Sequence, residues 1–191
     1  DFDMKKNGVS TDYHTRRYFY HEVFSGACGH TFGSTGVWQV YDPEKYRPAG
    51  DVFTRWEESL GRIASYQMGY GKELILSRPY FTRIPDQSFI LEAYDNLYRI
   101  TGTRDKDRTY AFVYTERGKP VAVDLTAIGK GKTVRVWWYD VRSGRAIDLG
   151  EHKRVKSAVF DPVTHGEGND WVLVIDDPGR KYPAPGSAVY R

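Results

Sequence analysis

The chain has 191 residues, of which 40% are hydrophobic and 28% charged, an ordinary composition for a soluble globular protein. This length suffices for one sizeable core or two small ones. The net charge of +3 is spread along the chain without a basic run, so we expect no nucleic-acid partner. No stretch approaches the roughly 18 consecutive apolar residues of a membrane span, and the chain as given opens with no secretion signal. We therefore expect no membrane partner.

The single cysteine, Cys28, excludes an intrachain disulfide framework and a multi-cysteine zinc site. It lies in a run of small apolar residues, which favours a buried, inert thiol over a nucleophile. The histidines are too loosely spaced for a zinc site, and the segment 166–170 lacks the alternating oxygen ligands of a calcium loop. We expect no metal and no cofactor.

The first part of the chain has helical periodicity. Apolar residues recur at helical steps over 12–24, after a cap-like Ser10-Thr11-Asp12, and again over 54–76. Between them we expect a short buried strand that ends at His30, and then a loop through Gly50. Three glycines, Gly61, Gly69 and Gly71, weaken the second helix or permit close packing against another element.

After residue 85 the pattern changes to short β-prone runs about ten residues apart. Turn signals separate the runs, which favours an antiparallel β-sandwich. In the run 133–139, Val and Trp side chains alternate with Arg135, Trp137 and Tyr139, so we expect one face of that strand to meet solvent or a partner. The runs are 89–94, 97–103, 109–115, 120–125, 133–139, 145–149, 155–160 and 171–176.

The first part of the chain resembles apiosidase-like glycoside hydrolases. These are (β/α)₈-barrel enzymes acting on plant polysaccharides. The segments that carry the resemblance are STDYHTRR (10–17), GACGHTFG (26–33), WQ (38–39), QMG (67–69) and SRP (77–79).

The second part resembles the β-sandwich domain that usually follows that barrel, which is named for collagen binding in a collagenase. Its matching segments are RIPDQS (83–88), YAFVY (110–114), VWWYD (136–140) with SG (143–144), and GEGNDWVL (166–173). The resemblance implies an α+β chain: residues 1–82 form the last βα unit of a (β/α)₈ barrel, and residues 83–191 an antiparallel β-sandwich.

The resemblance also implies two catalytic carboxylates that this chain lacks. The nucleophile glutamate belongs on the strand just before residue 1 and the acid/base further upstream, so we expect no catalytic residue and no hydrolysis by this chain alone. The front carboxylates are scattered; we interpret Asp12 as a helix cap and Glu57-Glu58 as a solvated helix face. The carboxylates concerned are Asp3, Asp12, Glu22, Asp42, Glu57 and Glu58.

Three residues are candidates for substrate binding. At the end of a barrel strand, His30 can hydrogen-bond a sugar hydroxyl or orient a carboxylate, although backbone partners can also satisfy it. Trp38 can stack on a sugar ring with Gln39 as a hydrogen-bonding neighbour, or simply pack.

The sequence leaves two function hypotheses. The first is the C-terminal portion of a bacterial glycoside hydrolase, secreted or periplasmic, that acts on pectic polysaccharide. The second is a non-catalytic β-sandwich module that binds polysaccharide or collagen through a flat aromatic row or a groove.

One barrel strand cannot close a barrel, so something must cover the apolar stripe of 54–76. The candidates are the sandwich, a second copy of the chain, and another chain that carries the rest of the barrel. We expect the last two, with Trp137, Trp138 or Tyr139 where the sandwich meets the barrel.

Overall fold

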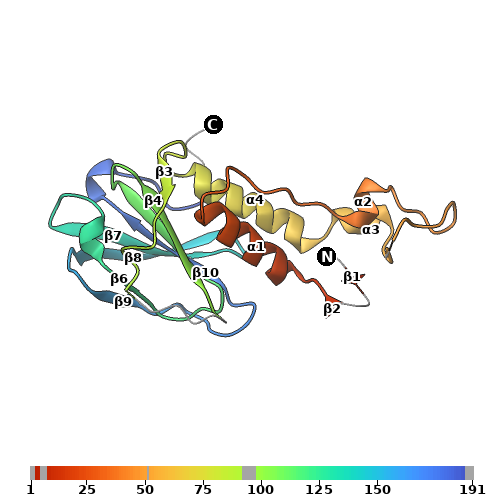
Figure 1. Ribbon diagram of the computed structural model, residues 1–191. Helices are drawn as coiled ribbons and strands as arrows, with labels where there is room; N and C mark the ends of the chain where they lie inside the picture. Colours follow the sequence, from red (N-terminus) through yellow and green to blue (C-terminus); the bar gives the residue numbers. More distant parts are fainter. Residues whose placement is uncertain (1–2, 5–7, 51, 92–97, 188–191) are drawn as a thin grey trace.

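The computed structural model describes residues 3–4, 8–50, 52–91 and 98–187. Its main body has three layers, in which a six-stranded antiparallel sheet lies between two long helices and a small two-stranded sheet (Figure 1). The helices are α1 (Asp12–Phe24), α2 (Thr35–Trp38), α3 (Trp56–Leu60) and α4 (Ile63–Leu76), with 3₁₀ turns η1 (Leu125–Ala127) and η2 (Pro178–Arg180). No helix among the described residues is long and apolar enough to cross a membrane.

The six-stranded sheet has the order β3-β4-β5-β10-β7-β8, and every neighbouring pair is antiparallel. A separate pair, β6 and β9, packs on one face, and β1 pairs with β2 before the first helix. The strands are β1 (Asp3–Met4), β2 (Gly8–Val9), β3 (Arg83–Pro85), β4 (Ile100–Asp105), β5 (Tyr110–Thr115), β6 (Val121–Val123), β7 (Thr133–Asp140), β8 (Arg145–Lys153), β9 (Ala158–Phe160) and β10 (Trp171–Asp176).

The central strands are buried on both faces, because each face of the sheet has its own core. In β10, Leu173 and Ile175 join the core beneath β6 and β9, whereas Val172 and Val174 join the core beneath the helices. This explains why β10 is a continuous apolar run in sequence: alternation between polar and apolar residues needs one solvated face.

The expected α+β class with an antiparallel sandwich is confirmed. The predicted runs coincide with β4 to β10 within a few residues, except that β8 continues to Lys153 and β9 begins only at Ala158. The first run, 89–94, forms only an isolated bridge between Ile90 and Val123, and its residues 92–94 lie outside the described residues. The strand β3 was not predicted.

The strand predicted to end at His30 is wrong. Residues 25–34 have no helix or strand, and the first of them continue the end of α1: the Gly26 amide donates to the Val23 carbonyl and the Ala27 amide to that of Glu22. A strand needs a neighbour to satisfy its backbone groups. The described residues offer this segment none.

The single helix predicted over 54–76 is also wrong, because α3 and α4 are separate. Gly61 ends α3, and Arg62 takes an extended conformation (φ −66°, ψ 135°) before α4 begins. Gly61 has the weak helix propensity that the sequence indicated.

The sheet of the sandwich packs against α1 and α4, and the covering of the remaining helical surface by other chains stays a prediction. The inward side chains of α4, Ala64 and Leu74, are fully buried. The face of β7 predicted to meet solvent or a partner lies beneath the helices: Trp137 is 7% exposed and Tyr139 is fully buried, with its hydroxyl donating to the Tyr70 carbonyl (2.9 Å). Trp137 and Tyr139 therefore do stand where the two parts meet, whereas Trp138 belongs to the opposite core.

Candidate functional site

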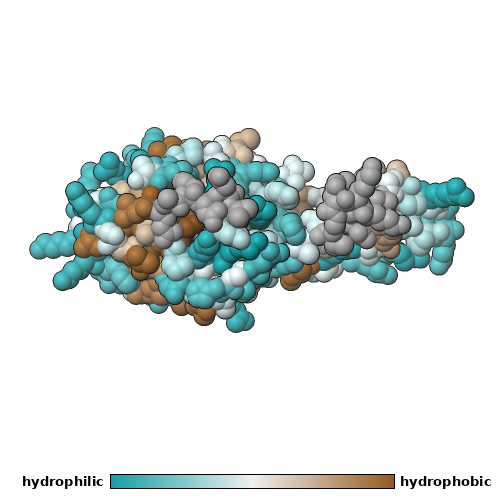
Figure 2. All heavy atoms as spheres, turned by 60° about the horizontal axis from the view of Figure 1, so that its bottom comes forward, coloured by the Kyte–Doolittle hydropathy of each residue, from teal (hydrophilic) through white to brown (hydrophobic). Residues whose placement is uncertain are grey.

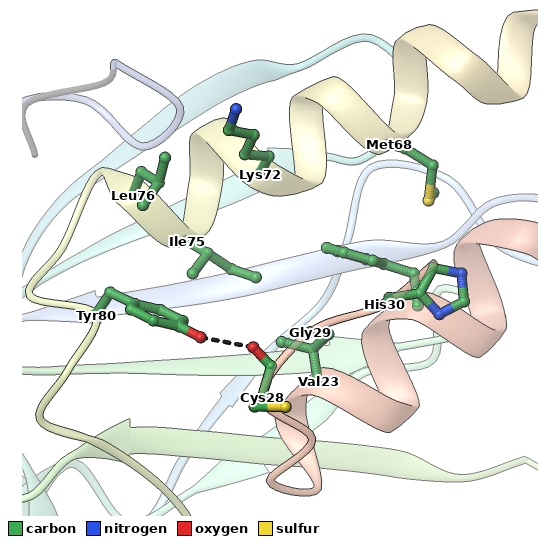
Figure 3. A pocket seen from close by; sticks show the side chains of 10 residues that line it. Val23, Cys28, Gly29, His30, Met68, Lys72, Ile75, Leu76 and Tyr80 are labelled. Atoms are coloured by element: carbon green, nitrogen blue, oxygen red, sulfur yellow. Dashed lines mark hydrogen bonds between the residues drawn. The ribbon is translucent and has the colours of Figure 1, made fainter. Parts of the chain in front are cut away.

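A groove of about 350 Å³ lies between α1, α4 and the segment 28–30 (Figure 3). Its lining is mainly apolar, and no carboxylate contributes to it. The groove is lined by Phe19, Val23, Cys28, Gly29, His30, Met68, Lys72, Ile75, Leu76 and Tyr80. This volume falls in the range of small-molecule sites, which usually combine an apolar wall with a few polar groups.

The close approach of the two helices depends on Gly71. A Cβ atom at this position would stand 2.4 Å from Cε1 of Phe19, so no larger residue fits without displacement. Gly69, two residues earlier, has open space around its Cβ position. Of the glycines singled out in the sequence, Gly71 is thus the one that permits packing of α4 against α1.

His30 lines the groove and is bound to a carboxylate. Its Nδ1 lies 2.8 Å from Oε2 of Glu22, and its ring packs edge-on against Phe19 at a centroid distance of 5.7 Å. When Nδ1–H donates to the carboxylate, Nε2 is left as an acceptor. The hydrogen-bond partner of His30 is therefore a side-chain carboxylate rather than the backbone, and the ring remains beside the groove.

Trp38 and Gln39 lie elsewhere, at the end of α2, and neither lines the groove. In Figure 1, α2 and α3 extend away from the sheet. Trp38 is 67% exposed, so it is no core residue. The amide of Gln39 makes two hydrogen bonds with the backbone of Ala49, accepting at 2.8 Å and donating at 3.0 Å, and thereby holds the loop 39–49 together. The structure does not gather the three predicted residues into one site.

Cys28 is exposed, which corrects the prediction of a buried thiol. With no strand formed, its side chain has no sheet to pack into. Its carbonyl accepts a hydrogen bond from the Tyr80 hydroxyl (2.6 Å), which anchors the segment beside the groove (Figure 3).

The front carboxylates are engaged with cations or solvated. Asp42 pairs with Lys45 (3.1 Å), and Asp12 accepts from Arg16 (2.5 Å). Burial tends to raise the pKa of Asp12, but the hydrogen bond and charge of Arg16 outweigh it, so the pKa is lowered. The prediction of Asp12 as the helix cap is off by one position: Thr11 is the N-cap, and Asp12 is the first residue of α1. The side chain of Asp3 lies outside the described residues.

The sequence did not reveal two buried ion pairs that join the helices to the two ends of β10. Arg16 of α1 binds Asp170 before β10, and Arg78 after α4 binds Asp176 at its end, with Nη2–Oδ 2.7 Å in both pairs. Trp137 Nε1 also donates to Asp176 (3.1 Å). In the sequence, Arg16, Arg78, Trp137 and Asp170 stood out only as members of the motifs, and Asp176 only as the end of a predicted strand, because no local pattern signals a partner so distant in sequence.

Residues 1–82 match the family described as "Apiosidase-like, catalytic domain". Residues 84–176 match the family described as "Putative collagen-binding domain of a collagenase". The resemblance expected from the sequence is confirmed.

Two solved structures have the same fold over nearly the whole chain. One is a protein titled "Glycoside hydrolase", 32% identical over 92% of this chain, with a TM-score of 0.84. The other is a glycoside hydrolase family 5 protein from Bacteroides vulgatus ATCC 8482, 29% identical over 97% of this chain, with a TM-score of 0.86. The chain spans only 39% and 41% of their lengths. No curated protein matches it.

The apiosidase-like part and the collagen-binding-type part therefore share one body. The motif residues that carry the resemblance form two clusters at the contact between the two parts, one at each end of β10. Arg16, Gln67 and Asp170 form the first, and Arg78 and Trp137 form the second around Asp176. Among described residues, no group of three His, Cys, Asp or Glu side chains could hold a metal ion.

Proposed function

We propose that this chain is the C-terminal portion of a glycoside hydrolase of the apiosidase-like type that acts on pectic polysaccharide, either secreted from the cell or in the periplasm. The family match of residues 1–82 and the likeness to two glycoside hydrolases support this assignment. In this proposal, the acid/base and the nucleophile belong to a part of the enzyme outside these 191 residues, and this chain alone does not hydrolyse glycosides.

The lining of the groove is the observation that carries the proposal. Retaining hydrolysis needs two carboxyl groups about 5 Å apart over the scissile bond. The groove contains none, and the nearest acidic partner of a lining residue, Glu22, is bound to His30. Such a groove fits packing or substrate positioning better than proton transfer.

The apolar lining also indicates what covers the groove. Half-buried Met68 and Leu76 stand beside Phe19 and Val23, and apolar surface of this kind is normally buried in a complete assembly. We propose that another chain, which carries the rest of the barrel, packs here; a second copy of this chain would cover the groove without completing the barrel. His30 would then stand at the margin of the completed substrate cleft.

Activity on pectic oligosaccharides tests the proposal. The chain is assayed alone and mixed with a separately produced barrel part carrying both carboxylates, with reducing sugar as the readout. We expect turnover only in the mixture. Turnover by the chain alone would overturn the proposal.

A matched pair of variants tests the groove. Met68→Glu places a charge in the lining, whereas Tyr66→Glu places it on the exposed side of the same helix. We expect only Met68→Glu to weaken association with the barrel part and to lower turnover in the mixture. Equal effects of the two variants would show that the groove is not the contact.

The described residues of the sandwich do not form the flat aromatic row that the binding-module hypothesis expects. Among residues 84–91 and 98–187, the exposed large hydrophobic side chains are all aliphatic. In Figure 2, brown apolar surface lies scattered among hydrophilic side chains. A glycan-binding face on the sandwich would therefore have to rely on polar groups.

A further inference from the structure

A polar hollow of about 420 Å³ lies at the end of the sheet where β5 begins and β10 ends. Three segments form it: the turn after β4, the turn before β7, and residues 177–180 around η2. In Figure 1 the blue η2 marks this end, opposite α2 and α3. We call this hollow the basin; the charged residues that line it are Lys106, Asp107, Arg108, Lys130, Asp177 and Arg180.

The side chains that line the basin carry a net positive charge. Four cations face two carboxylates, and all four cationic residues are exposed. Within the described part of the chain, none of these four side chains makes an ion pair or a hydrogen bond. Cations gathered without partners create a positive potential that an oxyanion would relieve.

The walls of the basin are fixed by backbone hydrogen bonds. The Gly129 amide donates to the Arg108 carbonyl (2.7 Å), and the Asp177 amide donates to the Thr109 carbonyl (2.9 Å). Asp177 also caps η2, because its Oδ1 accepts from the Gly179 amide (3.0 Å). The three segments are thus held in place before any ligand arrives, which reduces the entropic cost of binding.

Two charged residues of this region have left-handed backbone conformations. Arg108 has φ +61° and Lys181, next to Arg180, has φ +52°. A side chain in this region of φ/ψ space costs about 1 kcal/mol or more relative to glycine, and such strain clusters at ligand sites. The chain thus keeps a cation at position 108 where glycine would be less strained.

We propose that the basin binds the carboxylate groups of an acidic polysaccharide, a polyuronate. Lysine and arginine donate to the uronate carboxylates, and Asp107 and Asp177 accept hydrogen bonds from sugar hydroxyls. Inorganic phosphate offers no such array of hydroxyls to the two aspartates. The lining contains no aromatic ring, so a neutral sugar would lack a stacking surface.

This site goes beyond the proposed hydrolase function, from which it takes only the choice of probe. Binding of oligogalacturonate to the full 191-residue chain is measured by calorimetry, with a neutral galactan of equal length as the comparison. We expect binding of oligogalacturonate only. Arg108→Asn and Lys130→Gln should each raise Kd by about tenfold, corresponding to ~1.4 kcal/mol.

Arg145→Gln is the matched control, because Arg145 is exposed and lies at the opposite end of the sheet, paired with Asp140. It should leave Kd unchanged. Arg108→Gly separates binding from folding: it removes the charge and relieves the strained backbone, so it should lose affinity without loss of thermal stability.

Three results would overturn the proposal: no binding of oligogalacturonate, equal weakening by Arg145→Gln, or phosphate binding as tightly as the oligosaccharide. The third would mark the basin as a simple anion site. None of them touches the hydrolase proposal, which turnover in the reconstituted mixture decides.

Discussion

Arg16 and Asp170, 154 positions apart in sequence, form a bidentate ion pair that is almost completely shielded from water. Nη2 of Arg16 lies 2.7 Å from Oδ1 of Asp170, and Nε lies 2.9 Å from Oδ2. The remaining nitrogen of the guanidinium reaches Gln67 of α4 (2.8 Å), and the Tyr114 hydroxyl donates to Asp170 (3.1 Å). One side chain therefore links α1, α4 and the sheet.

Removing Arg16 should destabilise the chain strongly. In Arg16→Met, Asp170 stays buried without its cation, and such a loss costs about 3–5 kcal/mol of unfolding free energy. Urea denaturation measures the change. The double variant Arg16→Met/Asp170→Leu should recover part of the loss, because it leaves no unpaired charge in the fully buried position of Asp170.

Arg17→Met is the control, since the Arg17 side chain is 41% exposed although it also binds a carboxylate, that of Glu116. Its cost should be smaller than that of Arg16→Met, because Glu116 keeps the hydrogen bond from His21 (2.9 Å). If Arg16→Met costs no more than Arg17→Met, the buried pair does not hold the two parts together.

Gly71→Ala should also destabilise the chain, although alanine is the better helix former. The new methyl group would meet the Phe19 ring, and overpacking of this kind costs about 1–3 kcal/mol. Gly69→Ala meets nothing and should be neutral or stabilising by up to about 1 kcal/mol. Thermal unfolding of the two variants gives the comparison, and a shift of the same sign in both would contradict the packing argument.

The sequence predicted the local secondary structure better than the pairing of strands and of distant side chains. Helical spacing located α1, and strand runs located β5, β7 and β10, because these elements have hydrophobic patterns of their own. The order β3-β4-β5-β10-β7-β8 and the pairs Arg16–Asp170 and Arg78–Asp176 depend on contacts between distant segments, which a single sequence does not encode locally.

The candidate site shows the same limit. His30 lines the groove, and its role in substrate binding stays a prediction. The strand expected to carry it needs neighbours that these residues do not provide, and Trp38 and Gln39 were grouped with it only by proximity in sequence. The basin was missed because its cations come from three separate turns.

Glu116 should make stability depend on acid pH. Its side chain is only 2% exposed, and burial tends to raise its pKa. The hydrogen bond from His21 (2.9 Å) and the charge of Arg17 outweigh burial, so the pKa is lowered in the folded chain. The stabilisation is then fully present above the unfolded pKa of about 4.3 and is lost as pH falls through the lower, folded value.

Denaturation at several values between about pH 6 and pH 3 measures this dependence. Glu116→Gln should lose less stability over this interval than the parent chain. Glu57→Gln removes a carboxylate that is 50% exposed and should follow the parent curve. An identical acid dependence of Glu116→Gln and the parent chain would assign the loss to other groups.

Trp38 and Gln39 are adjacent but should respond differently to truncation. Gln39→Ala removes both hydrogen bonds to the Ala49 backbone, so the loop 39–49 should open more often and stability should fall by about 1 kcal/mol. Faster hydrogen exchange of the Ala49 amide would report the opening. Trp38→Ala removes a mostly exposed ring and should change stability by no more than about 0.5 kcal/mol.

The kinetics of the reconstituted mixture then decide the role of Trp38. If its ring stacks on the sugar, Trp38→Ala should raise KM and leave kcat nearly unchanged, because stacking binds substrate and transition state alike. Trp38→Phe keeps a ring and should restore most of the lost affinity. An unchanged KM in Trp38→Ala would show that Trp38 does not bind substrate. Because the ring is exposed, we expect no structural role for it either.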